Sequence, residues 1–261
     1  PGHAMVACDM VELSGNPWAH CPRDFLKRQI ARASALGFEV FSSFEHEFFL
    51  FNADGSPLDT SNYATLDAFE SARVVIDDML EALDAGGLGP EMYYPESGTG
   101  QQEISIAPAK GLAGADRQVL FKTIIKGIAV KHGLRASFAA KPIPTSTGSG
   151  CHLHLSLWRD GVNAFFDPSD PIKLSPLAYQ AIAGVLEHLP ALCAVTVPSV
   201  NSYRRLQPGW WAGAYACYGL DNREASVRVL SSHLLPGSSG SSTNFELKTC
   251  DASSNPYLAL G

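Results

Sequence analysis

The stretch that decides the fold is FSSFEHEFFLF, residues 41–51, in which Glu45 and Glu47 interrupt a run of aromatic and aliphatic side chains. Side chains alternate between the two faces of a strand, so Glu45 and Glu47 point the same way. The apolar run from Phe48 to Phe51 indicates a buried core rather than a cofactor-binding segment. We therefore expect a strand over Glu39–Phe51 that presents carboxylates on one face.

Further carboxylates and one imidazole follow on other strand-like segments. Glu96 and Glu103 lie in YYPESGTGQQEISI, His152 in GSGCHLHLSL and Glu246 in NFELKTCD, while Cys151 alternates out of phase with His152 and is expected in the core. If these groups converged on one surface they would repel one another unless divalent cations lay between them, and oxygen-rich sets suit magnesium or manganese. The pattern predicts a hard-metal, phosphate-handling site.

Each of these signals also has an ordinary interpretation. A strand with Glu-x-Glu is usually a solvated sheet face, a lone histidine such as His152 is usually a hydrogen-bonded core residue, and Arg223 and Arg228 in DNREASVR could be surface charges. Taken together, the six acidic and imidazole groups favour the metal site.

Composition narrows the class of protein. The chain has 261 residues and 46% hydrophobic content, enough for a sizeable core, and a net charge of -7 with 19 scattered basic residues that gives no footprint for nucleic acid. Its six cysteines show no CxxC spacing, so we expect reduced thiols and neither a zinc site nor a disulfide framework. No 18-residue apolar run and no signal-like N-terminus is visible, which predicts a cytoplasmic protein without a membrane partner.

Helical and strand-like periods alternate along the chain. Half-polar strands of this kind are typical of antiparallel sheets, so we expect an α+β fold: a curved, mainly antiparallel sheet with helices packed on its outer face. GSSGSST, residues 237–243, reads as a flexible connection. The expected helices are Pro22–Leu36, Ala68–Ala85, Gly114–His132 and Pro176–Ala194, the last kinked or divided at Pro190. Besides Glu39–Phe51, the expected strands are Met5–Val11, one through Glu103 and Ile106, Arg135–Lys141, one through His152, a hairpin of Tyr215–Leu220 with Ala225–Leu230, and Asn244–Thr249.

From about Pro22 to its end, the chain resembles the catalytic domain of the glutamine synthetase family. The resemblance implies that residues 1–21 are the end of a missing N-terminal β-grasp domain and a linker. It implies that residues 22–261 are a catalytic domain that is incomplete at its C-terminus, so that the chain is truncated at both ends. The stretches that carry the resemblance, in matching order and spacing, are FEHEFFLF, ESGTGQQE, KPIPTSTGSGCHLHLSL, NSYRRLQPG, DNREASVRV and FELKTCDASSNPYLAL.

The same resemblance assigns roles residue by residue. It implies one metal at Glu47, Glu96 and Glu103, and a second at Glu45, His152 and Glu246. Arg205 would grip the substrate α-carboxylate, with Gly148 allowing close backbone approach to glutamate. The remaining implied roles are Arg223 and Arg228 at the phosphates, Lys248 as a catalytic residue in place of an arginine, and His154 and Ser156 at the nucleotide.

The implied activity is a ligation in two steps. ATP phosphorylates the γ-carboxylate of glutamate, and an amine then displaces phosphate to form an amide. Two or more Mg²⁺ or Mn²⁺ ions would assist. The resemblance also implies a ring-shaped homo-oligomer with active sites shared between subunits, so that the 261 residues alone would be nearly inactive.

Three positions depart from the glutamine-forming pattern. In NSYRRLQPGWWAG, Trp211 stands where a glutamate binds ammonium, Lys248 replaces an arginine, and Thr147 replaces an asparagine. A tryptophan cannot accept a proton, but its ring could hold a cation, pack an alkyl or aryl amine, or simply fill the loop. The acceptor is therefore expected to be ammonia or, more in keeping with Trp211, a larger primary amine such as a polyamine. The alternatives are an inactive structural relative, which should have lost ligands, and a guanidino-kinase-like phosphotransferase, which lacks this carboxylate set.

Overall fold

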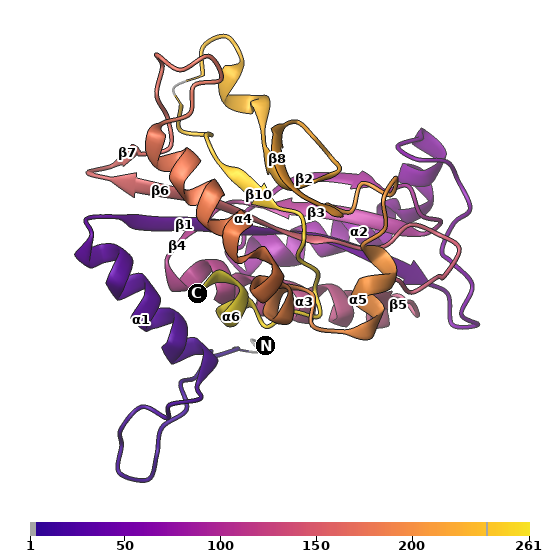
Figure 1. The fold of residues 1–261 in the computed structure, drawn as a ribbon. Coiled ribbons are helices and arrows are strands. Elements are labelled where there is room, and N and C mark those ends of the chain that lie inside the picture. The colour runs from indigo at the N-terminus through magenta and orange to yellow at the C-terminus, as the bar shows by residue number, and fades with distance from the viewer. Residues whose placement is uncertain (1–3, 239) are drawn as a thin grey trace.

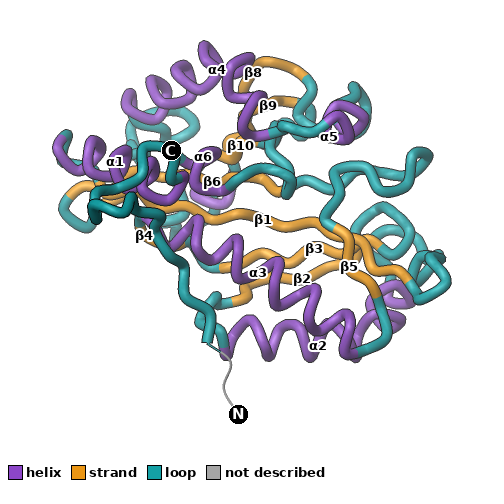
Figure 2. Tube along the Cα trace, turned by 90° about the horizontal axis from the view of Figure 1, so that it is seen from below, coloured by secondary structure: helices purple, strands orange, loops and turns teal. Residues whose placement is uncertain are grey.

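A computed structural model describes residues 4–238 and 240–261. Residues 1–3 of the expected N-terminal segment and residue 239 of the expected GSSGSST connection lie outside the described residues. The described chain forms an open sheet with helices gathered on one of its faces (Figure 1, Figure 2). The fold class predicted from the sequence, α+β with a mainly antiparallel sheet, is confirmed.

Ten strands of the described chain form one sheet, whose central path runs β2-β3-β1-β6-β10-β9-β8. Strands β4 and β5 pair with β1, and β7 pairs with β6. The strands are β1 (Glu39–Phe51), β2 (Pro90–Pro95), β3 (Gln101–Ile106), β4 (Ala109–Lys110), β5 (Arg135–Ser137), β6 (Cys151–Arg159), β7 (Val162–Asn163), β8 (Tyr215–Leu220), β9 (Ala225–Val229) and β10 (Phe245–Leu247).

Local sequence signals explain where several helices begin and end. The Thr65 hydroxyl caps α2, which ends before Gly86 and Gly87, and Gly133 follows α3 at a positive φ of 70° that a glycine adopts without strain. Ser175 caps α4, whose first residue is a proline. The helices are α1 (Pro22–Ala35), α2 (Leu66–Ala85), α3 (Leu112–Lys131), α4 (Pro176–Thr196), α5 (Val200–Arg205), the 3₁₀ helix η1 (Ser231–Leu234) and α6 (Pro256–Leu260).

Alternation along β1 separates the core from the polar face. Phe44, Phe48 and Leu50 are fully buried in the main core, together with Phe121 of α3. His46, on the same side as Phe44 and Phe48, stacks on the Phe121 ring with centroids 4.0 Å apart. Burial lowers the pKa of His46 to about 3, so this imidazole is neutral and belongs to the core. The opposite side of β1 is therefore left for Glu45 and Glu47.

The structure differs from the sequence prediction at four places. β8 and β9 pair in parallel, with Tyr215 beside Ala225, so the predicted hairpin is wrong. Residues 5–11 are exposed and form a single bridge, Val11 to Pro17, because they have no neighbouring strand to pair with. β5 ends at Ser137, before the chain reaches two prolines at 142 and 144. Helix α4 is continuous through Pro190, so of the two expected alternatives, a kink or a division into two helices, the division is wrong.

Helix α4 is long and apolar, a property that the sequence analysis did not single out. Of the described helices, it is the one long and apolar enough, by length and composition alone, to cross a membrane. A single helix of this kind is weak evidence for a membrane span, since core helices of water-soluble proteins can be equally long and apolar. Its side chains Ala178, Ile182 and Leu189 pack into the core.

Candidate active site

The register of the sheet brings the acidic strands side by side. In the pairing of β1 with β3, Glu47 lies directly opposite Glu103, and in that of β2 with β3, Tyr94 lies opposite Glu103. In the pairing of β1 with β6, Glu45 lies opposite His152. Directly opposed residues share a face, so these groups project from the same side of the sheet.

A further row extends this face across the sheet. His154 of β6 lies opposite Glu246 of β10, and Glu246 lies opposite Arg228 of β9. Residues that are up to 201 positions apart in the chain, Glu45 and Glu246, thus form one polar surface opposite the α3 side of β1. The predicted convergence of these side chains is what the structure displays.

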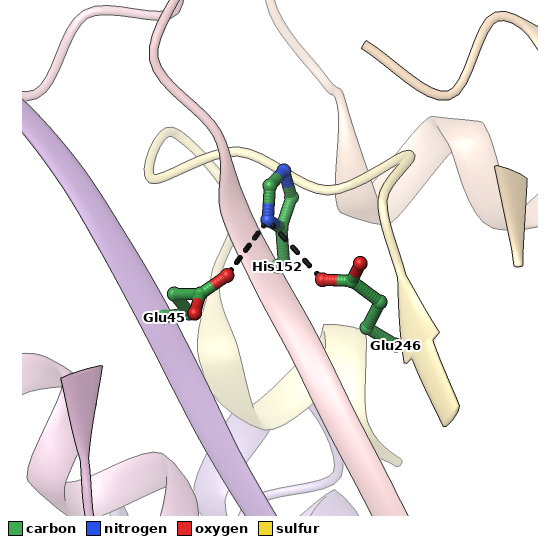
Figure 3. A group of neighbouring side chains, drawn as sticks. All are labelled: Glu45, His152 and Glu246. Atoms are coloured by element: carbon green, nitrogen blue, oxygen red, sulfur yellow. Dashed lines mark hydrogen bonds and ion pairs between the residues drawn. The ribbon is translucent and has the colours of Figure 1, made fainter. Parts of the chain in front are cut away.

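Glu45, His152 and Glu246 form the tightest group on this face (Figure 3). His152 Nδ1 lies 3.1 Å from Glu45 Oε2 and 3.3 Å from Glu246 Oε2, and the three donor atoms lie within 4.8 Å of one another. His154 Nε2 flanks the group at 3.6 Å from Glu45 Oε2 and 3.5 Å from Glu246 Oε2. Three elements, β1, β6 and β10, therefore aim one nitrogen and two oxygens at a common point.

The electrostatics of this group fit a divalent cation. Burial lowers the pKa of His152 to about 4, with nearby Lys248 acting in the same direction, so the imidazole is neutral as metal ligation requires. Burial raises the pKa of Glu45, but hydrogen bonds with His152 and His154 outweigh it and keep the carboxyl ionised. Glu246 Oε2 is buried and accepts no hydrogen bond from any residue that the structure describes. A cation there would satisfy that oxygen.

A second acidic set lies beside the first. Burial and, after it, the charge of Glu96 raise the pKa of Glu47 to about 7. Burial, followed by the charge of Glu45, also raises the pKa of Glu103 well above its usual range, and burial raises that of Glu96. Carboxylates that repel one another in this way are stabilised in their ionised form by a bound divalent ion. Glu47, Glu96 and Glu103 could thus hold a second cation.

Basic side chains surround the carboxylates. Arg205 is buried, and it donates from Nη1 to the Cys250 carbonyl at 3.1 Å and from Nη2 to the Lys248 carbonyl at 3.0 Å. Lys248 Nζ lies 3.4 Å from His152 Nε2. Arg228 Nη1 donates to Glu246 Oε1 at 2.9 Å. The site therefore combines cation-binding carboxylates with groups able to bind anions.

The candidate site residues divide between two adjoining pockets. His154 and Ser156 line the second, of about 450 Å³, which shares Glu45 and Met92 with the first. The other twelve line a first pocket of about 200 Å³ on the open face: Glu45, Glu47, Glu96, Glu103, His152, Glu246, Gly148, Arg205, Trp211, Arg223, Arg228 and Lys248.

Several residues at the site were not identified from the sequence. Tyr94 Oη donates to Glu103 Oε1, and Gln101 Nε2 donates to Glu47 Oε2 at 2.8 Å and to the Gly148 carbonyl at 2.9 Å. The Thr147 hydroxyl donates to Gln101 Oε1 at 2.6 Å. Such groups fix carboxylates that would bind a cation. Their roles depend on strand register and could not be found from spacing alone.

Aromatic residues complete the two pockets. Trp210, next to Trp211, lines the first pocket. In the second, Phe41 packs against Trp158 at a centroid distance of 5.2 Å, and Trp158 Nε1 donates to Ser156 Oγ at 3.0 Å. The second pocket thus offers apolar walls with hydroxyl groups beside the acidic floor.

Fold and site together define a class of protein, an α+β domain whose candidate site residues lie on the open face of a mainly antiparallel sheet. Residues 19–261 match the model of the glutamine synthetase catalytic domain. The chain therefore belongs to the glutamine synthetase family.

Relatives and solved structures agree with this assignment. The glutamine synthetase of Thermus thermophilus is 42% identical over 98% of this chain, and that of Halobacterium salinarum is 40% identical over 99%. A solved glutamine synthase homolog superposes with a TM-score of 0.89 at 40% identity over 97% of this chain and 59% of its own. GmaS in complex with ADP gives 0.84 at 35% identity, covering 94% and 58%. The chain spans 58% and 57% of the length of the two curated relatives.

Proposed function

We propose that this chain carries the catalytic site of an ATP-dependent ligase that joins an amine to the γ-carboxylate of glutamate through a γ-glutamyl phosphate. One observation carries the proposal: six potential cation ligands, four basic residues and Gly148 line a single pocket on the open face of the sheet. The adjoining pocket, with its apolar walls, fits a nucleotide base and ribose.

In this proposal, two Mg²⁺ or Mn²⁺ ions offset the charge of the nucleotide phosphates and of the carboxylate that receives the phosphoryl group. Glu45, His152 and Glu246 hold one ion. Glu47, Glu96 and Glu103 hold the other. The neutral state of His152 and the raised pKa values of the second set of carboxyls, which a bound cation would lower, support this division.

The basic side chains have separate roles in the proposal. Arg205 binds the substrate α-carboxylate, because its guanidinium is fixed by two backbone carbonyls and is therefore oriented before substrate arrives. Arg223, Arg228 and Lys248 neutralise the phosphates. Lys248 offers a point charge in place of a bidentate fork, which suits a phosphate oxygen better than a planar carboxylate.

Gly148 allows the backbone to approach the glutamate substrate closely. A Cβ on Gly148 would lie 2.6 Å from Arg205 Cγ and 2.6 Å from the Ala140 carbonyl oxygen, so a larger residue would displace Arg205. His154 and Ser156 contact the nucleotide from the second pocket.

Trp211 indicates which class of amine the site accepts. Trp211 is 54% exposed and lines the pocket, and it has no carboxylate that could bind ammonium by charge or accept its proton. We infer that the acceptor is a primary amine larger than ammonia.

We further propose that the active enzyme is cytoplasmic and is a homo-oligomer in which a neighbouring subunit completes each site. This chain spans 58% and 57% of the length of the two curated relatives, so this proposal concerns the full-length protein.

Phosphate release by the full-length protein tests the proposed function directly. We expect release to require glutamate, ATP, Mg²⁺ or Mn²⁺ and an amine, and to fall at least about 1,000-fold in Glu103→Ala, because the phosphoryl charge would be uncompensated. Glu81→Ala, an exposed glutamate of α2, is the control and should match the wild type. Full activity of Glu103→Ala, or release independent of glutamate, would exclude this ligase.

A further inference from the structure

Two neighbouring tryptophans form an aromatic rim at the mouth of the carboxylate pocket. The side chains of Trp210 and Trp211 are 45% and 54% exposed, and both line the pocket. Met92 and Leu230 lie on the same pocket wall. A substrate that enters past this rim would meet apolar surface before it reached the acidic floor.

The rim is held in place from its outer side. The Glu224 carboxylate accepts the backbone N–H of Trp211 at 2.9 Å and that of Gly209 at 3.2 Å. Trp211 has a φ of 54°, a conformation that is strained for a non-glycine residue and persists only where neighbouring contacts enforce it. Glu224 does not line the pocket among the described residues, so its carboxylate braces the segment instead of facing a substrate.

Each indole already carries a cation. The Arg223 guanidinium lies over the Trp211 ring, 5.4 Å from its centroid, and Lys141 Nζ lies over the Trp210 ring at 4.1 Å. Lys141 is buried, does not line the pocket and makes no ion pair with the residues that the structure describes. Arg223, Lys141 and Glu224 together carry one net positive charge, and Arg223 also interacts with the carboxyl of Glu96 in the pocket.

We propose that the amine acceptor is a primary monoamine with an uncharged, apolar substituent, and that the rim rejects diamines and polyamines. The proposal rests on the ligase function proposed above and names its substrate class. The carboxylate floor attracts the reacting amine, whereas a second ammonium group at the rim would meet the Arg223 guanidinium, which lines the pocket, and would be repelled by the charge of Lys141 on the Trp210 ring. Burial of an alkyl or aryl substituent against the same surface should raise kcat/KM by about fourfold for each methylene group buried.

A matched pair of amines tests the proposal on the full-length protein. Pentylamine and 1,5-diaminopentane have the same carbon chain and differ by one terminal ammonium group, and ammonium is the reference. We expect kcat/KM for pentylamine to exceed that for the diamine by at least about 30-fold. Equal or better use of the diamine would overturn this inference while leaving the ligase function intact. Turnover with ammonium alone, or with none of the three, would instead refute the proposed acceptor.

Removing one rim cation should shift the preference. In Lys141→Met, we expect the ratio of kcat/KM for pentylamine to that for the diamine to fall at least about fivefold, because one repulsive charge is lost. Lys126→Met is the matched control, since Lys126 Nζ also lies over an aromatic ring, Phe138, at 5.8 Å from its centroid and outside the active-site pockets. An unchanged ratio in Lys141→Met, or an equal shift in Lys126→Met, would contradict the role of the rim charge.

Discussion

Adding a single methyl group at Gly150 should disturb the candidate metal site without changing its charge. A Cβ there would lie 2.5 Å from His152 Nε2, 2.9 Å from Arg205 Nη2 and 2.9 Å from Glu47 Oε1. Ordinary contacts begin near 3.4 Å, so the His152 ring would have to move by about 0.9 Å. A shift of that size exceeds the roughly 0.5 Å tolerance of an ordered binding site.

The expected cost follows from this displacement. Crowding a packed region costs about 1–3 kcal/mol of folding stability, and moving one ligand of a metal site lowers metal affinity by about 10- to 100-fold. We therefore expect Gly150→Ala to fold, with a lower midpoint of unfolding, and to bind Mn²⁺ at least about tenfold more weakly than the wild type.

Mn²⁺ binding followed by electron paramagnetic resonance, together with urea unfolding, measures both effects. Gly127→Ala is the control, because a Cβ on Gly127 in α3 would meet no atom within 4 Å and should add about 1 kcal/mol of stability through helix propensity. If Gly150→Ala bound Mn²⁺ as tightly as the control, the position of His152 would not matter for the metal, and the reasoning would be refuted.

Three further predictions concern the supports of the site and fold. Tyr94→Phe removes the hydroxyl that donates to Glu103 and should weaken Mn²⁺ binding about tenfold with little change in stability; equal affinity in the same titration would argue against this support. Asp116→Asn should destabilise the fold by about 1–3 kcal/mol at pH 7, because Asp116 accepts charged hydrogen bonds from Arg23 at 3.0 Å and one from Tyr257 at 2.7 Å. Burial raises the pKa of Asp116, but the hydrogen bonds from Arg23 outweigh burial, so the net pKa is lowered. The stability that Asp116 contributes is therefore complete above about pH 5 and is lost as the pH falls below about 4. Urea unfolding across that range measures it, and a difference in stability between wild type and Asp116→Asn that stayed constant with pH would show that the prediction is wrong. The 261 residues expressed alone should bind Mn²⁺ yet turn over at least about 100-fold more slowly than the full-length protein, since a neighbouring subunit is proposed to complete the site; comparable turnover would contradict shared sites.

Strong local patterns allowed much of the fold to be predicted. The strand Glu39–Phe51 was predicted with its observed bounds, because its alternation is long and its apolar side is continuous. The four long helices, α1 to α4, were predicted to within a few residues, because glycines and prolines mark several of their ends, whereas α5 and η1 were not predicted. The side of β1 that carries Glu45 and Glu47 follows from the same alternation.

Pairing between distant segments explains the errors. Residues 221–224 form turns, as expected, but β8 and β9 pair in parallel and not as a hairpin, while β9 also pairs with β10 and Glu224 binds the backbone of Gly209 and Trp211. These contacts cannot be seen in a local pattern.

The geometry of the candidate site likewise could not be predicted from local sequence patterns. The identities of Glu45, His152 and Glu246 were suggested by residue type and by family resemblance, but their approach to within 4.8 Å depends on the β1, β6 and β10 registers. Tyr94 and Gln101 act only through that register, so spacing along the chain gave no sign of them.

Anomalous diffraction from crystals grown with Mn²⁺ and a nucleotide tests most directly whether this sheet face binds two divalent cations. We expect two peaks, one bounded by Glu45, His152 and Glu246 and the other by Glu47, Glu96 and Glu103. Peaks confined to other surfaces, or no ordered manganese on this face at saturating concentration, would contradict the proposed site and the ligase function built on it.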